Sequence, residues 1–327
     1  MTELRWNPTV HEWVSTASHR QHRPQMPKDW CPFCPGSGRV PDDYDVYIYP
    51  NDFPAFSIPP QVPAIEGDDF YPVRPALGKC DVVLYHPDHN TSIPQIPVDH
   101  LTRLVKIWRQ RFAELKATPG IRYVLIFENK GEVIGVTMPH PHGQIYSFPL
   151  VPPLIKKELA AARAHHRNHG RCLFCDILQK ERKFRRRIVA ENRAFTAFIP
   201  FYARWPYEVH VYPRRHLGAL DEFKPSEEKA LAEMLKWVTQ KYDNLFQMSF
   251  PYMMLLHQSP TRGRHPYYHF HIEFYPPHRS KEKLKYLASV ESGSGMFLND
   301  SLAEEKALEL RSAAPRTLHE VGRLPGK

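Results

Sequence analysis

Residues 140–144 read His-Pro-His-Gly-Gln, and residues 269–273 read His-Phe-His-Ile-Glu. In an extended chain, the two histidines of each segment share one face. Two further features precede each segment in the same order, a Cys-x-x-Cys pair (31–34 and 172–175) and an apolar run that ends in histidine (82–89 and 209–216). Because three features recur in one order, the sequence predicts two copies of one structural module.

The segments between these features are also alike. Apolar residues recur with a helical period from Asp99 to Leu115 and again from Ser226 to Leu245. A short strand-like run follows each helical stretch and leads to the His-x-His segment. We therefore predict an α+β fold of two duplicated modules, each mostly antiparallel sheet with one long helix, related by a pseudo-twofold axis.

The composition excludes several classes of protein. The chain has 327 residues and a formal net charge of +9 at pH 7. No apolar stretch approaches the roughly 18 residues that cross a bilayer, and the N-terminus lacks the apolar core of a signal peptide. These features predict a cytoplasmic protein without a membrane partner, and the modest positive charge suits an anionic small molecule.

A nucleic-acid-binding protein is the rival class, because basic residues surround Phe184 in residues 180–187. Duplicated His-x-His strands have no role in such a protein, so we expect no nucleic-acid partner. Binding to DNA that falls steeply with salt would favour the rival class.

The cysteine pairs favour metal binding, because disulfides are rare in proteins without export signals. Zinc binds four cysteine or histidine ligands as a tetrahedron, and a site with four protein ligands is structural. The first predicted zinc site consists of Cys31, Cys34, His89 and His140. The second consists of Cys172, Cys175, His216 and His269. The alternative is that the cysteines are buried thiols and that the second site has lost its metal.

His142 is the candidate nucleophile. If His140 binds zinc, His142 is held beside a fixed point, and a neutral imidazole is a capable nucleophile toward phosphorus. Gly143 would let a phosphate approach the backbone, and Gln144 could hydrogen-bond a phosphoryl oxygen without adding negative charge. The alternative is a structural histidine.

The second copy differs where this chemistry matters. Gln144 is replaced by Glu273, whose carboxylate would repel a phosphate, and Gly143 is replaced by Ile272. We therefore predict one active centre per chain. The N-terminal repeat, residues 1–150, should hold it with one zinc site, and the C-terminal repeat, residues 151–327, should be degenerate and hold the second.

Several further motifs occur in a fixed order. They are RWNP at 5–8, NDF at 51–53, PDH at 87–89, FENKG at 127–131, WPYE at 205–208 and FYPP at 274–277. With the His-x-His segments, this set resembles the galactose-1-phosphate uridylyltransferase family of the histidine-triad superfamily. The resemblance runs over nearly the whole chain and implies a duplicated histidine-triad-like module.

The resemblance also implies an activity. Members of this family transfer a nucleotidyl group between sugar phosphates in a ping-pong reaction. By resemblance, His142 attacks the α-phosphorus of UDP-glucose, releases glucose 1-phosphate and forms a covalent uridylyl intermediate. Galactose 1-phosphate then accepts the UMP group. UDP-glucose and a hexose 1-phosphate are thus the expected substrates, and two structural zinc ions the expected cofactors.

The family's substrate-binding residues match positions throughout this sequence. Asn51, Asp52 and Phe53 match the uridine-binding segment. Arg20, Arg23, Asn129 and Gln144 match residues that contact phosphates, and Lys285 and Tyr286 resemble a pair near the sugar phosphate. For Arg20 and Arg23 the alternative is a solvated basic stretch, and for Lys285 a surface helix position.

The sequence departs from the family pattern in three places. Thr137 and Met138 stand where Ser-Asn is common, so a hydroxyl is kept and an amide is lost. Some members have a distinct second metal site with a Glu and several His, whereas here the pair Cys172 and Cys175 favours zinc. Residues 292–300 look like a branch that includes nucleotide-sugar phosphorylases, so a phosphorylase using the same nucleophile is the alternative function. The oligomeric state stays open, with a homodimer as one candidate.

Overall fold

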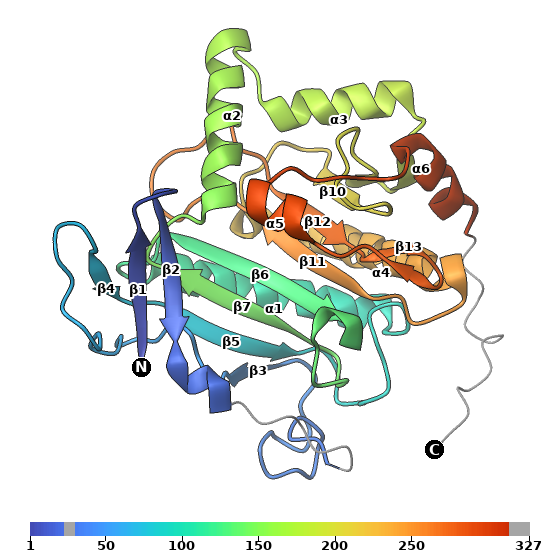
Figure 1. The fold of residues 1–327 in the computed structure, drawn as a ribbon. Helices are drawn as coiled ribbons and strands as arrows, with labels where there is room; N and C mark the ends of the chain where they lie inside the picture. The colour runs from blue at the N-terminus through green and yellow to red at the C-terminus, as the bar shows by residue number, and fades with distance from the viewer. Residues whose placement is uncertain (23–29, 314–327) are drawn as a thin grey trace.

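A nine-stranded antiparallel sheet forms the centre of the molecule in the computed structural model, which describes residues 1–22 and 30–313 (Figure 1). Its strands follow the order β3-β5-β7-β6-β11-β12-β10-β9-β8. In that order their bounds are Tyr47–Pro50, Lys79–Leu84, His142–Phe148, Tyr123–Lys130, Tyr252–His257, His271–Tyr275, Val209–Pro213, Phe195–Phe198 and Ile188–Glu191.

The strand order is a mirror repeat. From the centre outward, the first half runs β6-β7-β5-β3 and the second half runs β11-β12-β10-β9. The two halves meet where β6 pairs with β11, with Glu128 opposite Met254. The predicted α+β fold is thus confirmed, with the duplicated strands and one long helix in each half.

The long helices are α1 (Val98–Ala117) and α4 (Pro225–Phe246), which lie on one face of the sheet and pack against each other (Figure 1). Their apolar stripes enter one core, in which Trp108, Phe112 and Leu235 are fully buried. Each such side chain stabilises the fold by about 2 kcal/mol. One continuous core therefore joins the two halves.

The remaining elements are smaller. The strands β1 (Thr2–Asn7), β2 (Glu12–Ala17) and β4 (Val73–Pro75) form a separate sheet, followed by the 3-10 helix η1 (Ser18–His22). The helices α2 (Pro153–His169) and α3 (Leu173–Phe184) connect the halves. The C-terminal elements are β13 (His278–Ser280), β14 (Lys283–Leu284), α5 (Ser289–Ser294) and α6 (Ala303–Ser312). Two further 3-10 turns are η2 (Glu132–Ile134) and η3 (Leu220–Glu222).

Among the described residues, none of the helices combines the length and the apolar character that a membrane span requires.

Candidate active site and metal centres

A pocket opens where β7 begins. Six residues singled out in the sequence surround it: Asn51, Asp52, Phe53, Thr137, His142 and Gln144. The remaining lining residues are Phe33, Tyr49, Val82 and Met138. The sequence analysis assigned no substrate role to these four residues, although Met138 was noted as a departure from the family pattern and Phe33 lies inside the first Cys-x-x-Cys turn. The pocket therefore combines the candidate nucleophile with the expected nucleoside segment.

The ring of His142 has a defined orientation. Its Nδ1 lies 2.7 Å from the backbone carbonyl oxygen of His140. A carbonyl oxygen only accepts hydrogen bonds, so Nδ1 must carry the proton and Nε2 the lone pair of the neutral ring. Phe33 packs against the ring, with 5.9 Å between the centroids. The geometry thus selects the tautomer that a nucleophilic Nε2 needs.

Asp52 is held by two side chains that have no place in the predicted set. The Arg39 Nη2 donates to Asp52 Oδ2 over 2.8 Å, and the Tyr49 hydroxyl donates to Asp52 Oδ1 over 3.0 Å. Arg39 Nη2 also donates to the Tyr49 hydroxyl oxygen. Asn51 caps the same turn, because its Oδ1 accepts from the amide of Phe53 over 2.9 Å. Arg39 and Tyr49, which follow the Cys31–Cys34 turn in the chain, therefore fix the orientation of Asp52 in the candidate nucleoside segment.

Arg20 and Asn129 are not among the residues that line the pocket. Arg20 is adjacent, since its Nη1 donates to the carbonyl oxygen of Phe53 over 3.1 Å. Asn129 lies on β6, two residues after Phe127, which pairs with Gln144. Arg23 falls outside the described residues.

Lys285 and Tyr286 contribute nothing to this chain's pocket lining. Lys285 is buried, with its Nζ 3.0 Å from Glu291 Oε1, whereas the Tyr286 side chain is 70% exposed. From the sequence, the alternative for Lys285 was a surface position on a helix. The buried ion pair with Glu291 contradicts that alternative.

The reason for glycine at position 143 differs from our expectation. Successive strand residues point to opposite faces, so position 143 faces the helix side of the sheet and not the pocket. A Cβ atom there would lie 2.0 Å from the hydroxyl oxygen of Tyr85. The glycine therefore makes room for a buried tyrosine, and the expected approach of a phosphate to its backbone stays a prediction.

The first predicted metal set is assembled next to the pocket. The ligand atoms of Cys31, Cys34, His89 and His140 all lie within 4.8 Å of one another. Cys34 Sγ is 3.5 Å from His89 Nδ1 and 3.7 Å from His140 Nδ1. A tetrahedral zinc site requires separations of roughly 3.6 Å.

The protonation of this set also fits a metal. His140 Nε2 donates to the carbonyl oxygen of His86 over 2.9 Å, which leaves the Nδ1 lone pair toward the cysteines. Burial lowers the pKa of His140 to about 4, so its ring is neutral at pH 7. Burial, with Cys31 nearby, raises the pKa of the Cys34 thiol to about 11, so a bound metal must displace its proton.

The second predicted set is assembled in the same way. The ligand atoms of Cys172, Cys175, His216 and His269 lie within 4.8 Å of one another. Cys175 Sγ is 3.3 Å from Nδ1 of His216 and 3.3 Å from Nδ1 of His269. His269 Nε2 donates to the carbonyl oxygen of Pro213 over 3.0 Å, as His140 does to His86. Both sets therefore have the donor chemistry of a closed site.

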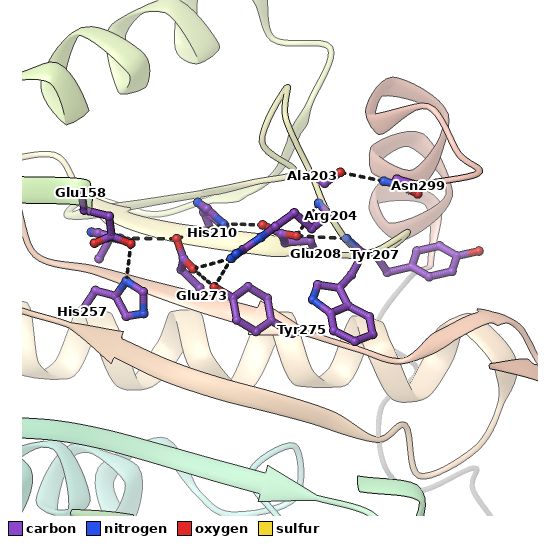
Figure 2. Close-up of polar contacts among 12 residues, drawn as sticks. Glu158, Ala203, Arg204, Tyr207, Glu208, His210, His257, Glu273, Tyr275 and Asn299 are labelled. Carbon is purple, nitrogen blue, oxygen red and sulfur yellow. Dashed lines mark hydrogen bonds and ion pairs between the residues drawn. The ribbon is translucent and has the colours of Figure 1, made fainter. Parts of the chain in front are cut away.

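The second-half counterpart of the pocket is filled by charged side chains (Figure 2). Gln144 pairs with Val82 across the sheet, and the equivalent Glu273 pairs with His210. His210 Nε2 lies 3.3 Å from Glu273 Oε1, and Arg204 reaches the same carboxylate at 3.5 Å. Burial alone would raise the pKa of Glu273, but the nearby His210 holds that pKa well below its usual range.

The same network surrounds His271, the counterpart of His142. Its Nε2 lies 3.4 Å from Glu273 Oε1 and 3.9 Å from Glu158 Oε2, so two carboxylates face the atom that would have to attack a phosphate. His257 Nδ1 lies 3.0 Å from Glu158 Oε1. Despite its burial, His257 has its pKa raised to about 9, chiefly by the Glu158 charge.

Sequence reasoning missed this cluster. Ligand atoms of Glu158, His257, His271 and Glu273 lie within 4.8 Å of one another, a separation at which they could hold an ion. They come from α2, β11 and β12, and a Glu and a His without a motif could not be placed there from the sequence. From the sequence we contrasted this chain with family members whose second metal site is built from a Glu and several His. The cluster shows that this chain also brings two Glu and two His side chains together.

Comparisons with known proteins agree with this architecture. The N-terminal domain model of galactose-1-phosphate uridyl transferase matches residues 1–152, and the C-terminal domain model matches residues 158–322. A galactose-1-phosphate uridylyltransferase of Thermotoga maritima is 42% identical over 95% of this chain and 98% of its own length. The enzyme of that name from Saccharomyces cerevisiae is 33% identical, over 94% and 93% of the two chains.

A solved structure described as a uridylyltransferase superposes with a TM-score of 0.89 at 36% identity, covering 95% of this chain and 98% of the other. Family models and relatives alike extend over both halves of the sheet. The chain belongs to the galactose-1-phosphate uridylyltransferase family.

Proposed function

We propose that the chain is a nucleotidyltransferase that moves UMP from UDP-glucose to a hexose 1-phosphate, with galactose 1-phosphate as the expected acceptor. One observation carries the proposal: His142, in the tautomer with its lone pair on Nε2, shares a pocket with Asn51, Asp52 and Phe53. The relatives that extend over the whole chain carry the corresponding name.

In the first step, His142 Nε2 forms a bond to the α-phosphorus of UDP-glucose. The bond from that phosphorus to the bridging oxygen breaks, and its electron pair leaves with glucose 1-phosphate. The ring then carries a positive charge, and the His140 carbonyl oxygen stabilises it by accepting from Nδ1. In the second step, a phosphate oxygen of galactose 1-phosphate attacks the same phosphorus, and the electron pair of the broken N–P bond returns to Nε2.

The other pocket residues orient the substrate. We assign Asn51, Asp52 and Phe53 to the nucleoside, since an aromatic face packs on a base and a carboxylate accepts from hydroxyl or imino groups. The Gln144 amide and the Thr137 hydroxyl can donate to phosphoryl oxygens. Arg20, beside Phe53, offers a guanidinium group to a diphosphate.

We assign zinc to both Cys2His2 sets, because two thiolates with two imidazoles in a tetrahedron are typical of structural zinc. Bound zinc would hold the Cys31–Cys34 turn, and with it Phe33, against the pocket. No step of the reaction passes through either metal.

We also propose a homodimer. The C-terminal segment carries several exposed apolar side chains, among them Tyr286 (70% exposed), Met296 (64%) and Leu298 (52%). A surface that a partner covers is typically rich in such side chains. Light scattering after gel filtration should give twice the 38.2 kDa chain mass, and Met296→Asp should shift the protein to the monomer.

Labelling with UDP-glucose that is radioactive in the uridine tests the reaction. The purified protein should retain covalent label, and galactose 1-phosphate should release it as UDP-galactose. Release by inorganic phosphate but not by any hexose 1-phosphate would identify a phosphorylase instead. A protein that retains no label would contradict the proposed function.

A further inference from the structure

Behind the catalytic strand, on the side away from the pocket, lies a polar group that the reaction does not use. The register that pairs Phe127 with Gln144 places Glu128 opposite Gly143. Both positions face the helix-covered core, where Glu128 is only 6% exposed. The hydroxyl of Tyr85 occupies the space that a side chain at position 143 would fill. A carboxyl group and a phenol thus meet directly behind the residue that follows the nucleophile.

The contacts of this pair are few. Tyr252 donates to Glu128 Oε1 over 3.1 Å. Within the described residues neither Glu128 Oε2 nor the Tyr85 hydroxyl has a hydrogen-bond partner of good geometry, although the two groups lie close enough for each to affect the pKa of the other. The nearby cation, Lys130, lies 3.0 Å from Asp243 and is therefore already paired. The Glu128 carboxyl group has no cation of its own.

The inactive half has no such group. The matching register places Leu256 opposite Ile272, and both side chains are fully buried. An apolar pair costs less free energy at a core position, because a buried carboxyl group loses hydration that its one hydrogen bond, from Tyr252, barely restores. Of the two matching positions, only the one in the half with the candidate active centre thus carries a buried carboxyl group. Local features that lower stability are typical of functional sites.

We propose that Glu128 is a positioning residue for nucleotidyl transfer: its side chain, buried behind the catalytic strand, keeps the Tyr85 hydroxyl against Gly143 and thereby fixes the backbone that carries His142. The inference rests on the proposed function. A displacement of the nucleophile by about 1 Å can lower a rate by about 100-fold. The Tyr85 contact at Gly143, one residue after His142, should therefore affect the rate at which His142 attacks phosphorus.

The protonation state of Glu128 enters through the same geometry. Burial raises its pKa to about 7, against the opposing effects of Lys130, Tyr252 and Tyr85. Above that pH the carboxylate can only accept a hydrogen bond, so the Tyr85 hydroxyl must turn its hydrogen toward Glu128, and the contact of its oxygen with Gly143 changes. The rate of label formation should therefore fall as the pH rises through about 7.

The test compares Glu128→Gln with Glu128→Leu, using the rate of covalent labelling by saturating UDP-glucose between pH 6 and 9. Gln keeps a neutral hydrogen-bonding group, so labelling should stay within about threefold of wild type and lose its decline near pH 7. Leu should lower the rate by about 100-fold with little change in the KM for UDP-glucose. Tyr85→Phe should lower the rate in the same direction.

Leu256→Ala, at the matching position of the inactive half, is the control for core disruption. It should lower stability while labelling keeps its wild-type rate per folded molecule. The inference is overturned if Glu128→Leu labels at the wild-type rate, or if Gln and Leu lose activity equally and the pH profile is unchanged. A wild-type protein that never labels would instead refute the proposed function.

Discussion

The carbonyl oxygen of His140 lies 2.7 Å from Nδ1 of His142, and the ring of the same His140 lies 3.8 Å from Cys31 Sγ. One residue thus joins the metal set by its side chain and fixes the tautomer of the nucleophile by its backbone. The second half repeats the arrangement, with 2.9 Å between His269 O and His271 Nδ1. The two halves therefore share the histidine pair, and two carboxylates face Nε2 of His271 in the second half.

Replacing His142 with Asn should abolish nucleotidyl transfer and leave the metal content unchanged. His142 lines the pocket, and its Nδ1 is committed to a carbonyl oxygen, so it is not a ligand of the first set. Labelling by UDP-glucose and metal analysis of the same preparation check both parts. A variant that still accumulates label, or that has lost its metal, would contradict the assignment.

The purified protein should contain about two zinc ions per chain, because two closed Cys2His2 sets are present. Cys172→Ser combined with Cys175→Ser should leave about one and lower the unfolding temperature, since structural zinc contributes directly to folding. Cys80→Ser, at a buried cysteine outside both sets, is the control. Intact protein with one metal, lost only on mutation of Cys31 or Cys34, would exclude zinc from the second set.

Wild-type protein should trap about one nucleotidyl group per chain. At His271 the carboxylates of Glu273 and Glu158 lie within 3.9 Å of Nε2 and repel an anionic phosphate at short range. His271→Asn should therefore keep labelling when compared at matched folded fraction. Label recovered on a peptide containing His271, or a stoichiometry near two, would place a second nucleophile in the C-terminal half.

The duplicated sheet was predictable because its features are local. Cysteine pairs, His-x-His strands and helical periods can each be recognised within about twenty residues, and their order repeats. The six pocket residues could be found for the same reason, since 51–53 and 137–144 are short motifs. The domain boundary near residue 150, the cytoplasmic location and the oligomeric state stay predictions.

The features that could not be predicted depend on distant contacts. We expected Gly143 to let a phosphate approach the backbone, because nothing in the sequence indicates that Tyr85 lies behind this glycine. The Glu158 and His257 pair joins a helix to a strand 99 residues later. Lys285 could be placed near a substrate only by resemblance, whereas its buried ion pair with Glu291 depends on how the C-terminal segment folds back.

Arg39→Gln should raise the KM for UDP-glucose by roughly fivefold without changing kcat, because Arg39 orients Asp52, which we assign to the nucleoside. The side chains of this pair are 45% and 49% exposed, so the effect should stay near 1 kcal/mol. Arg103→Gln breaks a similar exposed pair with Asp45, outside the pocket, and is the control. Equal KM values for the two variants would remove Arg39 from substrate binding.

Glu128 should also make the stability of the fold depend on pH. Its pKa is about 7 in the folded chain, where burial disfavours the charge, against 4.5 for an ordinary glutamate. Below pH 4.5 the Glu128 carboxyl group is protonated in both the folded and the unfolded chain, so its ionisation does not lower the free energy of unfolding. Between pH 4.5 and 7 the unfolded chain releases a proton that the native state retains, so the free energy of unfolding falls as the pH rises.

Above pH 7 both states are ionised, and the full penalty of about 3 kcal/mol persists. Glu128→Gln has no proton to lose, so its advantage over wild type should grow by most of that amount between pH 5 and pH 8. Urea denaturation at the two pH values measures the difference, and other titrating groups cancel because both proteins contain them. A gap between variant and wild type that is the same at pH 5 and pH 8 would mean that the Glu128 proton is lost as easily in the native core as in the unfolded chain.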